Sequence, residues 1–226
     1  VVGDVSTIEI LPVLEAYFGE LDGTETPLYS DAPDRSRGLH LVDQEGFGVA
    51  RISVVFPIPG REDPKHFVAE ALARVVAGRE TSRLDMALRE ESGLSYSVEA
   101  EIIPNMKWGW MRFDTEVLPE NVGEVLTQMK GLLSELRENG VDDSEFDAIR
   151  RGLVLESAQI LDMTREATEN LGELQRLQQG PDSHQARAVA LSLLQASQLS
   201  ELAQDVFAPG EASWFVTGDA SIIRPQ

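Results

Sequence analysis

Arg89 and Tyr96 have the types and the spacing that best suit a chemical role. They lie seven positions apart, at the end of one predicted element and the start of the next. A guanidinium offers several N–H donors at a fixed positive charge, and a phenol can donate to a carbonyl oxygen as that oxygen gains charge. Together the two side chains could hold a peptide backbone. The alternative is that Arg89 pairs with a nearby carboxylate such as Glu90, and that Tyr96 packs on a sheet.

The three histidines do not form a metal-binding pattern. His40, His66 and His184 are 26 and 118 residues apart, so no two fall at i, i+3 or i+4, and the chain has no cysteine. A zinc site needs three or four such ligands, usually at short spacings. We therefore expect neither a metal ligand nor a catalytic residue in this chain. His40 fits a strand, His66 the first turns of a helix, and His184 a polar segment.

A helix that turns directly into a strand must position the two candidate side chains. Leu84 and Leu88 share one stripe of a predicted amphipathic helix. Gly93 follows where a helix end favours a residue with positive φ. β-forming residues from position 95 onward predict a strand, and the alternation over 108–117 predicts a second strand paired with it as a meander.

The rest of the chain predicts clustered strands and long helices. The further strands are expected at 38–43, 49–57 and 212–218, and the helices near 7–18, 63–76, 119–138, 142–162, 164–179, 183–192 and 197–206. Helix starts are indicated by Ser6 with Glu9, by Asp63-Pro64 and by Asp142 with Glu145. This arrangement predicts the α+β class, as an α/β sandwich whose antiparallel or mixed sheet is covered by helices on one face.

The helix–strand segment resembles the pitrilysin/insulinase family of zinc metallopeptidases. The second half of those proteins carries a pattern of the form S-R-L-x-x-x-L-R-x-x-x-G-L-x-Y-S-V. This chain matches it at Ser82, Arg83, Leu84, Leu88, Arg89, Gly93, Leu94, Tyr96, Ser97 and Val98. Further counterparts are Gly60-x-x-Asp63-Pro64, Gly140-Val141 and Gly218-Asp219, so the resemblance covers nearly the whole chain.

The resemblance implies a non-catalytic C-terminal half. The catalytic half of the family binds zinc through His-x-x-Glu-His, which this chain lacks. This chain would help to enclose the chamber and would bind peptide substrate through Arg89 and Tyr96. Arg83 would fix the helix start. Zinc would belong to a partner catalytic half, in the same parent chain or in a separate subunit, and this chain alone would be inactive. The alternative is a pseudo-peptidase subunit with only an assembly or binding role.

The two ends of the chain resemble each other. Residues 1–8 and 215–222 both read as a strand running into Gly-Asp and a helix-start signal. We expect 1–21 to be the last strand and helix of a preceding half, 22–37 a linker, and 38–226 the non-catalytic domain. Residues 1–5 should then be frayed or paired with a sheet edge. The helix over 7–18 should dock through Ile8, Leu11, Leu14 and Phe18.

The amino-acid composition limits the kinds of molecule that this chain could bind. The chain has 226 residues, 42% of them hydrophobic, enough for a substantial core. Its net charge of −20 disfavours nucleic acid and anionic membrane surfaces as partners. No apolar run approaches the roughly 18 residues of a membrane helix. The absence of cysteine excludes disulfides but does not separate the bacterial periplasm from the cytoplasm.

Overall fold

The computed structural model describes residues 1–23, 32–78, 81–160, 162–180 and 182–223. Its elements along the chain are α1 (Thr7–Phe18), β1 (Gly38–Asp43), β2 (Ala50–Pro59), α2 (Lys65–Val76), α3 (Arg83–Asp85), the π-helix η1 (Met86–Glu91), β3 (Ser95–Pro104), β4 (Trp108–Val117), the 3₁₀ turn η2 (Pro119–Asn121), α4 (Val122–Asn139), α5 (Asp143–Gln159), α6 (Thr164–Arg176), α7 (Ser183–Leu193), α8 (Ala196–Val206) and β5 (Ser213–Gly218).

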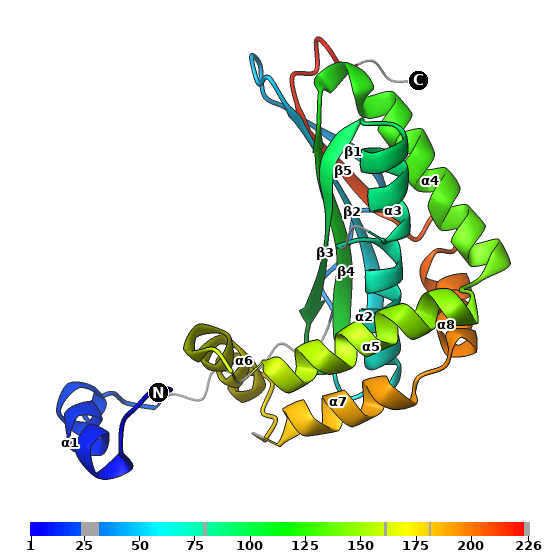
Figure 1. Cartoon of the computed structure of the whole chain (residues 1–226). Coiled ribbons are helices and arrows are strands. Elements are labelled where there is room, and N and C mark those ends of the chain that lie inside the picture. The colour runs from blue at the N-terminus through cyan, green and yellow to red at the C-terminus, as the bar shows by residue number, and fades with distance from the viewer. Residues whose placement is uncertain (24–31, 79–80, 161, 181, 224–226) are drawn as a thin grey trace.

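The five strands form one mixed sheet in the order β1-β5-β2-β4-β3. β1 pairs with β5 in parallel, and the other neighbours are antiparallel. Helices cover one face and leave the other open (Figure 1). β2 shows why: Ile52, Val54 and Phe56 alternate with less buried residues and face the helices. The predicted α+β sandwich with a mixed sheet is confirmed.

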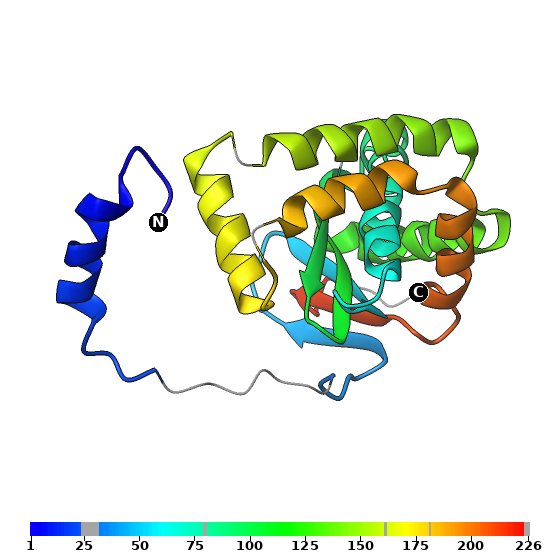
Figure 2. The same ribbon diagram turned by 90° about the horizontal axis from the view of Figure 1, so that it is seen from below.

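The core lies between the sheet and the helices α2, α4 and α8. Leu72 of α2, Met129 of α4 and Leu199 of α8 are fully buried with Phe113 of β4. α5 and α7 pack against each other and against α2, which places them in an outer layer, as the view from below shows (Figure 2). The sheet face away from these helices therefore stays available to other molecules.

Two glycines of the family pattern, Gly60 and Gly218, lie so close to neighbouring residues that a side chain would not fit easily. A Cβ on Gly60 would lie 2.3 Å from backbone atoms of Met106 and Lys107, because the β2–α2 turn packs directly on the β3–β4 turn. Arg61 N and Glu62 N donate to the carbonyls of that turn at 2.8 and 3.0 Å. At the other end of the sheet a Cβ on Gly218 would meet Ala50 at 3.0 Å.

Most predicted helix starts are present. Ser6 and Glu9 form the reciprocal capping box of α1, and the Asp142 side chain accepts from Ser144 N at 2.8 Å. Asp63 caps α2 in a shifted way, since its carboxylate accepts from Lys65 N at 2.9 Å while Pro64 occupies the N-cap position. Local chemistry alone specified these boundaries.

The predicted docking of α1 is wrong. The helix has the predicted bounds, but none of its residues is buried, and Ile8, Leu11 and Phe18 are 88%, 48% and 58% exposed. Both views show α1 apart from the sheet and its helices (Figures 1 and 2). The physical reason is that Val13 and Tyr17 are apolar and exposed as well, so the helix has no single stripe to lay on one surface.

Residues 1–5 form no strand in the structure. Val5 N donates to Gly3 O at 2.9 Å within a turn, and Val1 and Val5 are exposed. The predicted linker over 22–37 falls in part on residues 24–31, which lie outside the described residues. The proposed boundary between a preceding half and the domain stays a prediction.

Candidate functional site

Tyr96 projects from a β-bulge at the start of β3. Ser95 pairs with Val117 and Val98 pairs with Thr115, so three steps along β3 oppose two along β4. The extra residue bends the strand outward, and Tyr96 is 90% exposed. The bulge thus turns a phenol that a regular strand would pack on the sheet into a freely accessible donor.

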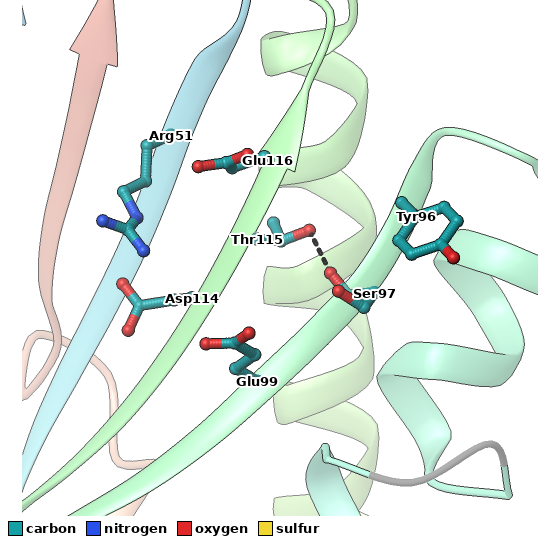
Figure 3. A pocket seen from close by; sticks show the side chains of 7 residues that line it. All are labelled: Arg51, Tyr96, Ser97, Glu99, Asp114, Thr115 and Glu116. Atoms are coloured by element: carbon teal, nitrogen blue, oxygen red, sulfur yellow. Dashed lines mark hydrogen bonds between the residues drawn. The ribbon is translucent and has the colours of Figure 1, made fainter.

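Hydrogen bonds hold the bulge in place. Both Ser95 Oγ and Thr115 Oγ1 donate to the Ser97 carbonyl at 2.9 Å, and the second of these bonds is drawn in Figure 3. Ser95 and Thr115 are buried, so the polar groups that fix the bulge are shielded from competing water. The position of the Tyr96 backbone is therefore well defined even though its side chain is exposed.

A cavity of about 170 Å³ opens on the uncovered sheet face beside the bulge. Its lining residues are Arg51, Tyr96, Ser97, Glu99, Asp114, Thr115 and Glu116. Figure 3 shows Arg51 and the three carboxylates gathered over β2, β4 and β3, whereas Tyr96 lies toward the helices. Arg112 pairs with Asp114, so Glu99 and Glu116 against Arg51 leave this part of the face with an excess of negative charge, which suits N–H donors and cations.

Asp114 is the most firmly held of these carboxylates. It is buried, accepts a hydrogen bond from Ser53 Oγ, and forms an ion pair with Arg112 Nε at 2.6 Å. Sequence reasoning did not select the cavity carboxylates as candidates. The available signal was the alternation over β4, which already put Arg112 and Asp114 on one side of the strand.

Arg89 lies on the π-helix η1, which precedes strand β3. Its side chain is 39% exposed, and its Nε lies 3.2 Å from Glu90 Oε1, so the local ion pair considered as the alternative is present. Arg89 is not among the seven residues that line the cavity. Neither Arg89 nor Tyr96 lies in the core, and their joint role stays a proposal.

The helix that carries Arg89 differs from the one predicted. Leu84 and Leu88 are fully buried and Gly93 has φ +63°, as expected, but only Arg83–Asp85 is α-helical. The following turn is a π-helix, in which Ser92 N donates to Ala87 O at 3.1 Å. Wider π turns redirect the side chains that follow and often occur at functional sites. Here the redirected turn is the one that presents Arg89.

Arg83 anchors this segment, as the sequence implied. Its Nε and Nη2 donate to the two carboxylate oxygens of Glu145 at 2.9 and 2.8 Å, and Nη2 also donates to Gly140 O at 3.0 Å. The ion pair with Glu145 raises the pKa of Arg83. Both partners of Arg83, Glu145 and Gly140, lie in the α4–α5 region, which fits an architectural role.

Asp85 is a positioning residue that sequence reasoning missed. Its buried carboxylate accepts from Ser82 Oγ at 2.5 Å, from Gly78 N at 3.1 Å and from Val98 N at 3.2 Å. It thereby joins the loop before α3, the helix itself and strand β3. The spacing of Ser82 and Asp85 is typical of a helix start, but it gives no signal for the bonds to Gly78 and Val98, which are 7 and 13 residues away.

The histidines occupy separate environments. His40 stacks on Phe215 with ring centroids 5.2 Å apart. His66 is buried, with Nδ1 2.9 Å from Pro59 O and Nε2 3.4 Å from Glu70 Oε1. The side chain of His184 lies outside the described residues. Across the described part of the chain, no three histidine, aspartate or glutamate side chains converge as metal ligands do.

Comparison with known families agrees with this architecture. A family model described as the peptidase M16 inactive domain matches residues 1–153. The chain belongs to this family. The resemblance to pitrilysin/insulinase-type metallopeptidases is thereby confirmed, with this chain as an inactive M16 domain. No curated protein matches by sequence, and none of the helices in the described segments is long and apolar enough to cross a membrane.

Solved structures share the fold of this M16 domain. A protease from Helicobacter pylori has a TM-score of 0.80 at 15% identity, over 96% of this chain and 53% of its own. An M16 inactive domain from Pseudomonas fluorescens has a TM-score of 0.73 at 16% identity, over 99% of this chain and 54% of its own. A chain of complex III2 from Candida albicans has a TM-score of 0.75 at 14% identity, over 96% and 53%. This chain spans about half the length of each.

Proposed function

We propose that this M16 domain is the non-catalytic half of a zinc metallopeptidase and helps to hold peptide substrate through Arg89 and Tyr96. Zinc and the residues that activate water would come from a catalytic half. The observation that carries the proposal is Tyr96, which stands 90% exposed on a fixed bulge at the rim of a cavity in the open sheet face. A large exposed side chain on a rigid support suits a binding role.

The two side chains would contribute different chemistry. The Tyr96 phenol would donate to the substrate carbonyl oxygen as it becomes negatively charged during metal-assisted hydrolysis. The Arg89 guanidinium, which forms an ion pair with Glu90, would donate to a neighbouring peptide carbonyl. Glu99 and Glu116, which line the same cavity as Tyr96, would favour a substrate that brings N–H donors or positive charge.

Exposed apolar residues support the existence of a partner half. Leu39 and Leu41 of the edge strand β1, which share one face of the strand, are 54% and 50% exposed. Neighbouring exposed apolar side chains commonly mark contact surfaces. A catalytic half resting on β1 would cover them.

A Tyr96→Phe variant in the enzyme assembled with its catalytic half tests the proposal. Loss of one oxyanion donor typically lowers kcat by about 10²–10³. Since Tyr96 is exposed, the melting temperature should not change. Tyr17→Phe on α1, where the tyrosine is 78% exposed, is the matched control and should keep full activity. An unchanged kcat for Tyr96→Phe would remove the proposed catalytic contribution.

The role of Arg89 can be tested through its neighbour. Arg89→Gln should raise KM, because a donor to the substrate backbone is lost. Glu90→Gln keeps the guanidinium and releases it from its ion pair, so KM should stay the same or fall. If both substitutions raise KM equally, the ion pair itself, and not substrate binding, explains the effect.

The second candidate is an assembly subunit without a proteolytic role. Two observations favour it: Arg89 is already paired with Glu90, and the fold recurs in a chain of complex III2. The sequence upstream of residue 1, or an adjacent gene, separates the two candidates. An intact His-x-x-Glu-His and peptide cleavage by the assembled protein support the peptidase half, and cleavage-incompetent assemblies support the subunit.

A further inference from the structure

The outer edge of β3 carries unpaired backbone groups. Strand β3 is the last strand of the sheet, and at Val98 both backbone groups point outward, since Val98 N donates to Asp85 at 3.2 Å and Val98 O accepts from Gly78 N at 3.0 Å. Backbone groups of an antiparallel strand alternate in direction. Ala100 and Ile102 therefore also point outward, and the structure gives their edge groups no partner among the described residues.

The same edge is closed on both sides of Ala100 and Ile102. Gly78 and Asp85 cover it at Val98, and Arg176 of α6 donates to Pro104 O at 3.0 Å. An edge that is capped at its two ends cannot pair with a long strand. It leaves a gap of a few residues, which suits the end of a chain better than its middle.

A cavity of about 220 Å³ faces this gap. Ala100, Ile102 and Pro104 form one wall, and Arg74 of α2 and Arg187 of α7 are among the residues of the others. The cavity has no residue in common with the one beside Tyr96. It is therefore a second site, and its ligand does not depend on the function proposed above.

The charged side chains around the cavity are unevenly paired. Glu70 binds Arg61 through one oxygen, at 2.5 Å, and Arg187 through the other, at 2.7 Å, so one buried carboxylate serves two guanidinium groups. Among the described residues, Arg74 has a 3.5 Å contact with Glu156. Glu173 also lines the cavity and lies 3.9 Å from Arg176. With these partners counted among the described residues, four arginines face three glutamates, an excess of one positive charge in a chain of net charge −20.

Arg74 shows the effect of this imbalance. Burial and the nearby positive charge of Arg187 lower the pKa of Arg74, and the more distant Glu70 only partly offsets them. A bound anion would stabilise the charged form of Arg74. Arginine also matches the planar geometry of a carboxylate, which it can bind through two N–H groups.

We infer that this cavity binds the C-terminal end of a peptide, with its backbone hydrogen-bonded to the edge of β3 at Ala100 and Ile102 and its terminal carboxylate against Arg74 and Arg187. Two features of the described residues point to that ligand together. Unpaired edge groups recognise an extended backbone, and arginines recognise the carboxylate that ends it. Peptides with a free C-terminus are the ligand class, and the side chains of their last residues would be of secondary importance.

The test compares two peptides on the purified chain. N-acetyl-tetra-alanine with a free carboxylate should bind in a calorimetric titration and shift the amide NMR signals of Ala100 and Ile102. The same peptide with a C-terminal amide should bind at least about tenfold more weakly, since it loses a charge-assisted contact. Equal binding of both peptides, or shifts that spare Ala100 and Ile102, would overturn the inference.

Variants separate the site from general electrostatics. Arg74→Gln should weaken the free-acid peptide about tenfold and leave the amide unchanged. Arg165→Gln removes an 83% exposed arginine of α6 and should change neither. Circular dichroism confirms that both variants are folded. If inorganic phosphate binds at Arg74 while neither peptide does, the site takes simple oxyanions and the assignment to peptide ends is wrong.

Discussion

Arg83 of α3 binds both carboxylate oxygens of Glu145 of α5, at 2.9 and 2.8 Å. The pair is mostly shielded, with side-chain exposures of 22% and 26%. It connects the short helix before Arg89 and Tyr96 to the start of the outer helical layer. The position of the candidate peptide-binding residues therefore depends on a contact 62 residues away in sequence.

Arg83→Lys should lower the free energy of unfolding by about 1–2 kcal/mol, because an ammonium cannot make the two parallel bonds to Glu145 and the third bond to Gly140 O. Urea denaturation of both proteins measures it. Arg165→Lys, whose arginine pairs with Glu169 on the surface, is the control and should change stability by less than about 0.5 kcal/mol. Equal effects at the two positions would mean that the pair with Glu145 adds no special stability.

Asp85→Asn should destabilise the domain by about 2–4 kcal/mol. The amide presents one acceptor oxygen in place of two, so at least one of the donors Ser82 Oγ, Gly78 N and Val98 N loses its partner in a buried place. Hydrogen exchange should report the loss at the amide of Val98, because Gly78 N keeps a second acceptor in Val98 O. Unchanged protection of the Val98 amide would show that Asp85 does not hold the helix to β3.

Gly60→Ala should destabilise by about 1–3 kcal/mol, because the new Cβ would overlap backbone atoms of the β3–β4 turn at 2.3 Å and the turn must move. Gly131→Ala on α4 is the matched control: nothing lies within 4 Å of its Cβ. Removing a glycine from a helix interior should there stabilise by roughly 0.5–1 kcal/mol. Thermal unfolding of the two variants should shift in opposite directions, and shifts of the same sign would contradict the packing argument.

Acid should weaken the domain through Glu70. Burial by itself would raise the pKa of Glu70, but the contact with His66 Nε2 and the positive charges of Arg187 and Arg61 outweigh it and lower that pKa to about 2. The ionised form is thus favoured in the folded state. Its stabilisation is complete above the usual pKa of 4.5 and is lost as the pH falls from there toward 2.

Glu70→Gln isolates this contribution. At pH 6 the variant should be less stable by roughly 3 kcal/mol, which corresponds to the difference between the two pKa values. The gap between variant and wild type should close as the pH approaches 2. Glu169→Gln, at a 63% exposed position, provides the control and should follow the wild-type curve. A gap that stays constant with pH would rule out the charge of Glu70 as its cause.

Zinc should not remain on the isolated chain. The sequence places no two histidines at helical spacing, and among the described residues no metal-ligand group converges. After dialysis we expect less than one zinc per chain by elemental analysis, and no cleavage of peptides. One tightly held zinc per chain would contradict this expectation and direct attention to His184, whose side chain lies outside the described residues.

Local patterns predicted most elements because each signal acts over a few residues. The capping box at Ser6, the Asp142 cap and the positive φ of Gly93 need only their neighbours in sequence. The π-helix at Met86–Glu91 was not predicted, since apolar spacing alone cannot distinguish an i−4 from an i−5 hydrogen bond. The docking of α1 was predicted wrongly because Val13 and Tyr17 make the helix apolar on several sides, so it has no single stripe to lay on one surface.

The charged cluster could not be predicted for a different reason. Arg61, Glu70 and Arg187 are brought together from the β2–α2 turn, α2 and α7, and the last two partners are 117 residues apart. Each residue alone looks like an ordinary surface charge in a chain with 26% charged residues. Only the packing of α7 against α2 shows that Glu70 is buried and shared.

The parallel pairing of β1 with β5 sets an order of events during synthesis on the ribosome. Gly38 of β1 lies opposite Ser213 of β5, and β5 stands between β1 and β2. Until β5 has been synthesised, β1 has no neighbouring strand to pair with, and the backbone groups of Leu39 and Leu41 remain without strand partners. The β2–β4–β3 meander can form early from nearby residues. Insertion of β5 between β1 and β2 is then the closing step, and until it occurs β1 has no strand to pair with.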